Sequence, residues 1–364
     1  MKIAAVGDIM PGGVWNGKQG EFVSEDILEI LRQADIRVGT LETAIGNEPE
    51  FYDEKMSRSA DVIYAKDEDL FRLKILDINL VSLANNHFFD LGPKGAEHAI
   101  GLLDSLGILH CGAGKNLEEA SRPVVYEFDG NTIAFLAFCD WRSETVGWCP
   151  FATEDTPGVN PMYDDYVVRE ISKYKKQYDY VAVIPHWGKE HTFITTEHVY
   201  TLADLMVKAG ADLIFGGHTH RIQPVIKKKT AIIAYSMGNF FFPDRLIVKP
   251  RSTYYPNGPL DISQLPTTDR YPFVDDTTLK IWKPLARIGM IVVTELDRGK
   301  MSEQSFFVKL DDSNCMKAYR LSIKTRLPLH WQKFFLMFMP YTLYEWAVRM
   351  VKRTVKRIKT EIGI

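Results

Sequence analysis

A short apolar stretch that ends in two glycines and a His-x-His pair constrains the fold of this chain more than any other feature. The run Leu213–Phe215 is typical of a buried strand, and the two glycines after it let the backbone turn sharply. His218 and His220 follow, and because alternate residues of extended backbone share a face, both imidazoles are expected to point to one spot. Two solvated loop histidines would explain a lone pair equally well, so the interpretation depends on what else ends nearby.

Polar side chains of the same chemical kind follow several other predicted strands. Apolar runs at 2–6, 36–41, 79–84 and 180–184 alternate with predicted helices, which favours an α/β fold whose strands end at one ligand-binding edge. The residues at these strand ends, with the His-x-His pair, are Asp8, Glu42, Asn86, His87, His186, His218 and His220. Carboxylates, imidazoles and an amide oxygen suit divalent ions such as Mn²⁺, Fe²⁺ or Zn²⁺. Any one of these residues is ordinary at a strand end, but the set predicts a metal site.

Turn signals and composition indicate how the rest of the chain is organised. Apolar runs flank Asp129–Asn131 and Asp297–Lys300, which predicts two hairpins and therefore mixed sheets. Residues 243–285 are rich in proline and aromatic residues, which is typical of a long insertion or a lid loop. We predict one domain over residues 1–312 and a basic amphipathic helical tail over residues 313–364.

Charge and cysteine content exclude some classes of protein. The 364-residue chain has a formal net charge of −3, which does not suggest binding to nucleic acid. The four cysteines show no Cys-x-x-Cys spacing, and the N-terminus enters a strand at Lys2 without a signal-peptide pattern. A cytoplasmic location is therefore expected.

The tail carries a pattern of its own. The apolar run 334–339 precedes Pro340, and residues 341–362 are predicted to form a helix. Its apolar stripe consists of Tyr344, Val348, Val351, Val355, Ile358 and Ile362, with basic residues on the remaining faces. Such a helix fits the anionic inner face of a membrane, where the protein would be held peripherally. Docking on its own domain, or on a second copy in a homo-oligomer, would also bury the stripe.

The order of the strand-end motifs resembles the calcineurin-like metallophosphoesterase superfamily, and most closely its CapA-like branch of capsule or poly-γ-glutamate synthesis proteins. The superfamily pattern is carried by Gly7-Asp8, Glu42, Asn86-His87, His186 and Gly217-His218-Thr219-His220. The CapA-like branch is suggested by the runs at 40–42, 84–92, 112–120, 186–190, 217–224 and 235–240, and the resemblance covers about residues 2–242. It implies an α/β fold built as a four-layer α-β-β-α sandwich with mixed sheets.

The resemblance also implies a set of metal ligands. Glu42 takes the place of the carboxylate that bridges two metals. The other matched ligands are Asn86, His186 and His218 for one metal and Asp8 and His220 for the second. Met10 stands where the wider superfamily has a histidine, and a thioether is a soft, weak ligand beside an imidazole. We therefore expect one strong divalent site and one that is weak or absent.

Residues beside these ligands receive further roles. His87 matches the histidine that acts on the leaving group, and Asp90 is expected to orient it or to cap the next helix. For Arg221, contact with a substrate anion and exposure to solvent are equally expected. Candidate substrate-binding residues are Trp187, Glu190 and Asn239, although packing beneath His186 also explains Trp187 and turn chemistry also explains Asn239.

Three hypotheses about function follow. The one that we favour is a CapA-like, metal-dependent hydrolase or transferase that acts on an anionic small molecule or polymer, of phosphoester or polyglutamate type, in capsule or polymer biosynthesis. A metal-independent acid–base enzyme on the same fold, such as a peptide or amino-acid epimerase, is favoured by Met10. The third is a non-catalytic, membrane-peripheral subunit of a polymer-synthesis complex.

Overall fold

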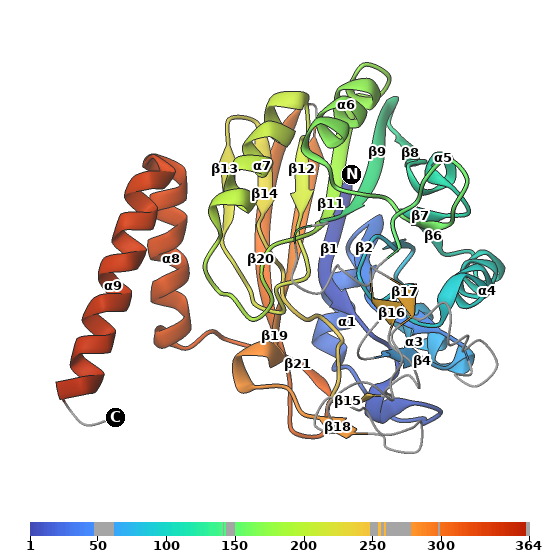
Figure 1. The fold of residues 1–364 in the computed structure, drawn as a ribbon, viewed down its shortest axis with the longest axis horizontal. Helices are drawn as coiled ribbons and strands as arrows, with labels where there is room; N and C mark the ends of the chain where they lie inside the picture. The colour runs from blue at the N-terminus through green and yellow to red at the C-terminus, as the bar shows by residue number, and fades with distance from the viewer. Residues whose placement is uncertain are drawn as a thin grey trace.

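Two large sheets pack face to face in the part of the chain that the structure describes. The computed structural model describes residues 1–46, 62–140, 142, 150–247, 254–255, 258–259, 278–297 and 299–361. Helices cover the outer face of each sheet, so the architecture is a four-layer α-β-β-α sandwich with mixed sheets (Figure 1). The predicted fold class is confirmed.

The first sheet combines strands from both ends of the sequence. Its order is β21 (Met316–Ala318), β20 (Lys300–Leu310), β19 (Ile288–Asp297), β1 (Lys2–Ile9), β2 (Ile36–Leu41), β5 (Leu80–Ser82) and β6 (Leu109–Cys111). The strands from β1 to β6 in this order are parallel, whereas β19, β20 and β21 are antiparallel to their neighbours. The parallel half therefore delivers its strand ends to one edge.

The second sheet is built from the middle of the chain. Its order is β13 (Val225–Lys228), β14 (Ala231–Ala234), β12 (Leu213–Phe215), β11 (Tyr180–His186), β9 (Asn131–Cys139) and β8 (Val124–Phe128). The inner four strands are parallel, and β13 and β8 pair antiparallel at the two borders. Both hairpins predicted around Asp129–Asn131 and Asp297–Lys300 are present.

Alternation along the strands explains why the second sheet is covered on both faces. In β9, Phe135 and Ala137 pack between the sheets, while Leu136 and Phe138 belong to a second cluster beneath the helices. Because successive strand residues point to opposite faces, an almost continuous apolar run is what a sheet buried on both sides requires.

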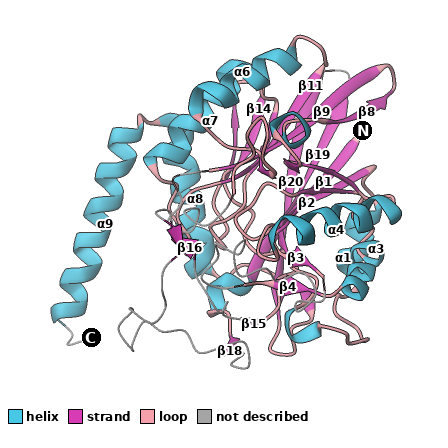
Figure 2. Cartoon of the chain, turned by 45° about the vertical axis from the view of Figure 1, so that its right-hand side comes forward, coloured by secondary structure: helices cyan, strands magenta, loops and turns pink. Residues whose placement is uncertain are grey.

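Helices provide the two outer layers, as Figure 2 shows. Those that pack on the first sheet are α1 (Glu25–Arg32), α3 (Phe71–Ile75) and α4 (Gly92–Ser105), and those on the second are α6 (Asp164–Lys175) and α7 (Glu197–Ala209). The short helix α5 (Leu117–Ala120) follows β7 (Ala113–Gly114). Gly210 ends α7 in the left-handed conformation that an L-residue adopts only with strain.

The C-terminal part of the chain differs in detail from the prediction. Strand β21 belongs to the first sheet, so the domain extends past residue 312. Two helices follow it, α8 (Ile323–Phe338) and α9 (Tyr341–Glu361), whereas the sequence predicted a separate helix only after Pro340, and Pro328 lies inside α8. Pro328 is the sixth residue of α8, so the helix lacks the hydrogen bond that an N–H at this position would donate to the carbonyl of Lys324.

Most of the predicted insertion or lid loop at 243–285 lies outside the described residues. Among the described residues, no helix combines the length and the apolar character needed to cross a bilayer.

A buried arginine holds the loop that follows β1. The Arg72 guanidinium lies 2.6 Å from Asp69 Oδ1 and donates to the carbonyl oxygens of Pro11 and Trp15 at 2.7 and 3.0 Å. Both members of the pair are buried. Removing one partner of a buried ion pair leaves the other charge uncompensated.

We expect Arg72→Met to lower the free energy of unfolding by about 3 kcal/mol or more, measured by chemical denaturation. The matched control is Arg32→Met, which removes an exposed pair with Glu25 and should cost less than about 1 kcal/mol. Equal effects of the two substitutions would contradict the structural role of Arg72.

Candidate metal centre

The candidate site lies where the carboxyl ends of parallel strands from both sheets meet. Asp8 lies near the end of β1, and its N–H donates to the carbonyl of Gly238 at 2.9 Å. Glu42 directly follows β2 and is fixed by a 2.9 Å hydrogen bond from its N–H to the carbonyl of Ile9. His186 ends β11, and it forms a bridge with Gly217 after β12. The site therefore depends on both sheets.

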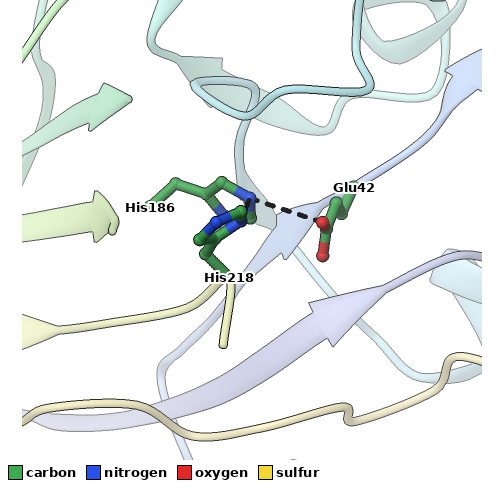
Figure 3. A group of neighbouring side chains, drawn as sticks. All are labelled: Glu42, His186 and His218. Atoms are coloured by element: carbon green, nitrogen blue, oxygen red, sulfur yellow. Dashed lines mark hydrogen bonds and ion pairs between the residues drawn. The ribbon is translucent and has the colours of Figure 1, made fainter. Parts of the chain in front are cut away.

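The first group of side chains consists of Glu42, His186 and His218, whose ligand atoms all lie within 4.8 Å of one another. Nε2 of His186 lies 3.4 Å from Glu42 Oε1 and 3.1 Å from His218 Nδ1. Figure 3 shows the two imidazoles facing the carboxylate of Glu42. Asn86 Oδ1 lies 2.8 Å from the same His186 nitrogen, which places the amide in this group.

The second group consists of Asp8, Glu42 and His220, whose ligand atoms also lie within 4.8 Å of one another. Nε2 of His220 lies 3.7 Å from Glu42 Oε1, and its Nδ1 lies 3.7 Å from Asp8 Oδ2. Glu42 thus belongs to both groups. All six residues that the sequence predicted as ligands come together in these two groups.

The His-x-His pair reaches the site in a way that the sequence argument did not foresee. Strand β12 ends at Phe215, and His218 and His220 lie in a turn with φ of 81° and 51°. The expected strand alternation is therefore wrong for this pair. Left-handed backbone at a residue with a Cβ stores strain, and such strain tends to gather at functional sites.

Burial sets the protonation of these groups. It raises the pKa of Asp8 well above its ordinary value and that of Glu42 to about 8, because the charged carboxylates lack solvent. It lowers the pKa of His186 and His220 well below the usual range and that of His218 to about 3. The protein alone therefore favours neutral side chains here.

The residues fit a divalent cation. Several of their polar atoms are buried without a hydrogen-bond partner among the described residues, namely Asp8 Oδ1, both oxygens of Glu42, His186 Nδ1 and His218 Nε2. Buried polar atoms are almost always paired, so this concentration calls for an external partner. Carboxylate oxygens with neutral imidazole nitrogens are the donor set of Mn²⁺, Fe²⁺ and Zn²⁺.

His87 and Asp90 form a pair beside the ligands. His87 Nδ1 lies 2.7 Å from Asp90 Oδ2, which also accepts the Ile63 N–H at 2.8 Å. Burial opposes a charge on the imidazole, but the charge and hydrogen bond of Asp90 outweigh it, so the pKa of His87 lies above its ordinary value. Asp90 thus orients the ring, and helix α4 begins two residues later without a cap from its side chain.

Comparison with known proteins assigns this chain to a family. Residues 2–244 match the family described as bacterial capsule synthesis protein PGA_cap. The chain belongs to the PGA_cap family. The CapA-like resemblance expected from the motifs is thereby confirmed.

Curated relatives agree with this assignment. The PGA biosynthesis protein CapA of Bacillus subtilis is 31% identical over 65% of this chain and 62% of its own length. The capsule biosynthesis protein CapA of Bacillus anthracis is 32% identical over 66% of this chain and 60% of its own. The chain thus spans about three fifths of the length of these relatives.

Among solved structures, a hypothetical protein of Thermus thermophilus aligns with 85% of this chain and 99% of its own length, at 13% identity and a TM-score of 0.47.

This PGA_cap protein carries an apolar cluster beside its second ligand group. Met10 is fully buried there with Ile63, Phe242, Trp282 and Ala286. The Trp282 ring lies 4.9 Å from the His220 ring, between centroids. The position that a superfamily histidine would occupy is therefore part of a hydrophobic contact.

Two predicted substrate-binding residues are corrected by the structure. Trp187 is fully buried under the helices of the second sheet, and its Nε1 donates to the Tyr235 carbonyl at 2.8 Å, so its ring cannot stack on a substrate. Asn239 is also fully buried. Its Nδ2 donates to the Ala286 carbonyl, and its Oδ1 accepts from His220 Nδ1 at 2.8 Å. Asn239 therefore holds the His220 tautomer whose Nε2 is available as a ligand.

Glu190, the third predicted substrate-binding residue, and Arg221 form no side-chain hydrogen bond or ion pair with the ligands in the described part of the chain. Glu190 is partly exposed, and its charge acts on both Glu42 and His87. Arg221 is half-buried, and its Nη1 has no hydrogen-bond partner among the described residues. Its charge acts on His191, whose ring lies 5.8 Å from that of His220.

Sequence reasoning missed two charged residues at this edge. Asp140 follows β9, is almost fully buried, and donates its N–H to the His186 carbonyl at 2.9 Å. The available signal was that Asp140 closely follows the apolar run after the hairpin turn at Asp129–Asn131, as Glu42 follows the run at 36–41. Arg245 begins β15 (Arg245–Ile247), and its guanidinium lies 4.1 Å from the Trp282 ring centroid. Its charge counteracts the burial that raises the pKa of Glu42; no sequence pattern marked it.

Gly217 is required at the centre of the site. A Cβ at this position would lie 2.4 Å from Asp8 Oδ1 and 3.4 Å from His186 Nδ1. We expect Gly217→Ala to lower the free energy of unfolding by about 1–3 kcal/mol, because the fully buried Asp8 would have to shift away from the new methyl group.

The control for this substitution is Gly101→Ala, at an exposed helical glycine with open space around its Cβ position. It should stabilise the protein by about 0.5–1 kcal/mol in the same denaturation assay. A neutral result for Gly217→Ala would show that the ligands are packed less tightly than described.

Proposed function

We propose that this protein is a metal-dependent hydrolase or transferase that acts on an anionic substrate in capsule or polyglutamate synthesis. The observation that supports it is the position of Glu42, a buried carboxylate shared by two histidine-containing groups. Glu42 can therefore serve two neighbouring cations, with Asn86, His186 and His218 beside the first and Asp8 and His220 beside the second. A cation bound here would polarise a phosphoryl-type oxygen and make a water molecule more acidic.

The side chains around the ligands suit the remaining steps. Asp90 accepts the hydrogen bond from His87 Nδ1 and raises the pKa of the ring, so the protonated ring can donate its Nε2–H to a leaving oxygen. Asn239 fixes the orientation of the His220 ring through its Nδ1. The fixed rings need no reorganisation when substrate binds, which is how positioned donors lower a barrier.

The charges near the site favour an anionic substrate. Arg245 and Arg221 bring guanidinium groups toward the His220 side of the site, and Arg221 Nη1 is buried without a partner among the described residues. Guanidinium groups recognise carboxylate and phosphate in a planar, bidentate way. The family and its CapA relatives supply the link to capsule polymer synthesis.

A metal-independent acid–base enzyme is the second candidate, and the apolar surroundings of Met10 favour it. Without a histidine at this position, the Asp8 group offers fewer ligands, and the site could use carboxyl and imidazole groups alone. The two candidates differ in metal content and in their response to chelators.

The purified protein should bind at least one divalent ion per chain after loading with manganese or zinc, as measured by elemental analysis. We expect His218→Ala to abolish this binding, because it removes a ligand of the complete group. His220→Ala should leave one ion bound. Loss of a ligand removes most of the affinity of such a site.

His98→Ala is the control for both substitutions, because His98 pairs with Asp67 on the surface. It should leave metal content unchanged. Wild-type protein without bound metal, or full metal binding by His218→Ala, would rule out the metal-dependent reading.

His87→Ala should reduce turnover by roughly 10²–10⁴-fold while metal content stays constant, because the ring acts beside the ligands. The assay is hydrolysis of phosphodiester and phosphomonoester substrates by the metal-loaded protein. His110→Ala, which breaks a surface pair with Asp104, is the matched control.

Loss of metal from His87→Ala would show that this residue is a ligand and not a proton donor. Metal-loaded wild-type protein that hydrolyses neither phosphoester nor peptide substrates would favour a non-catalytic role in polymer synthesis.

A further inference from the structure

The two C-terminal helices form a hairpin beside the second sheet (Figure 1). One face of it is docked on the domain. Leu336, Tyr344 and Val348 are buried in the cluster that also contains the residues of α6 and α7. Tyr344 Oη donates to Gln332 Oε1 at 2.8 Å, and Gln332 Nε2 donates to the Phe193 carbonyl at 3.2 Å.

This docking corrects the predicted stripe of the tail. Tyr344 and Val348, which begin that stripe, face the domain and not solvent. The side chains of Val351, Val355, Ile358 and Ile362 lie outside the described part of the chain. The alternative that the sequence left open, docking on the protein's own domain, is what the start of α9 does.

A different apolar face of the hairpin is exposed. On α8 it consists of Ile323, Leu327, Phe334 and Phe338, with exposed fractions of 74%, 64%, 50% and 66%. Their spacing of four, seven and four residues keeps them on one side of the helix. The neighbouring rings of Phe334 and Phe338 lie 5.4 Å apart between centroids.

Helix α9 carries an exposed apolar row of its own. Leu343, Trp346 and Met350 are exposed at steps of three and four residues, on a side of the helix that the buried Tyr344 and Val348 do not occupy. Large exposed apolar side chains in such a row are rare on monomeric proteins, and they mark a surface that a lipid membrane or another protein covers.

The charge of the hairpin identifies the kind of partner. From residue 319 to residue 361 the sequence has ten basic side chains, at 320, 324, 326, 333, 349, 352, 353, 356, 357 and 359, and two acidic ones, at 345 and 361. Among those with described side chains, Arg320, Lys324, Arg326, Arg349 and Arg353 are exposed. A second copy would bring like charges together, whereas an anionic surface is complementary to this one.

We propose that the exposed apolar face of the α8–α9 hairpin docks on an anionic lipid bilayer. Phe, Leu, Ile and Trp side chains enter the boundary between headgroups and acyl chains, and the surrounding Lys and Arg side chains contact anionic headgroups. The buried face of the same hairpin fixes the domain to this surface. The hairpin thus has two apolar faces, of which one packs on the domain and the other contacts the lipid.

The test is co-sedimentation of the full-length protein with vesicles of phosphatidylcholine, with or without phosphatidylglycerol. Wild-type protein should pellet with the anionic vesicles, less so at high salt. Phe334→Glu/Trp346→Glu should lower partitioning at least about tenfold. Lys324→Glu/Arg353→Glu should lower it roughly fivefold or more for each side chain.

The control variants carry the same kinds of substitution at exposed positions outside the hairpin. Leu109→Glu/Leu285→Glu substitutes apolar residues outside the hairpin, and Lys94→Glu/Lys176→Glu reverses two remote charges. Both should bind vesicles like the wild type, and circular dichroism should show every variant folded. Equal pelleting of Phe334→Glu/Trp346→Glu and wild type overturns the proposal. The proposal is also overturned if the wild-type protein binds no vesicles but forms a dimer in sedimentation velocity, and Phe334→Glu/Trp346→Glu disrupts that dimer.

Discussion

Two carboxylates, those of Asp8 and Glu42, are buried together beside three imidazoles, and the surrounding structure is arranged around this unfavourable concentration of ionisable groups. Because their charged forms lack solvent, the protein alone holds acids and imidazoles neutral. Asp90 and Asn239 then use side-chain hydrogen bonds to fix the orientation of His87 and His220. Gly217 removes the Cβ that would displace Asp8. The same features that make the protein-only state costly make the site suited to a cation.

The sequence was sufficient to predict most of this site because parallel strands deliver their ends to one edge. Asp8, Glu42 and His186 each follow an apolar strand, so their approximate positions followed from strand boundaries alone. Roles that depend on side-chain direction were not predictable in this way. Trp187 lies one residue after His186 and therefore points to the opposite, buried face. Asn239 is occupied by partners at both ends of its amide, which no local pattern could indicate.

The tail shows a second limit of pattern analysis. Helical periodicity indicates that a face is apolar, but it does not say what covers that face. In α9 the stripe that begins with Tyr344 and Val348 is covered by the domain, while Leu343, Trp346 and Met350 form another row that the sequence argument passed over. Helix α8 was not delimited because the sequence argument described residues 334–339 only as an apolar run before Pro340.

The order of strands in the first sheet has a consequence for how the chain is made. Strand β1 pairs on one side with β2, which follows soon after it, and on the other side with β19, where Lys2 lies opposite Glu295. During synthesis the second sheet, made from the middle of the chain, is available long before β19 leaves the ribosome. Until then one edge of β1 has no strand partner, and an open edge invites pairing with other chains. The nascent protein thus spends most of its synthesis with the strand that carries Asp8 lacking its native neighbour on one side.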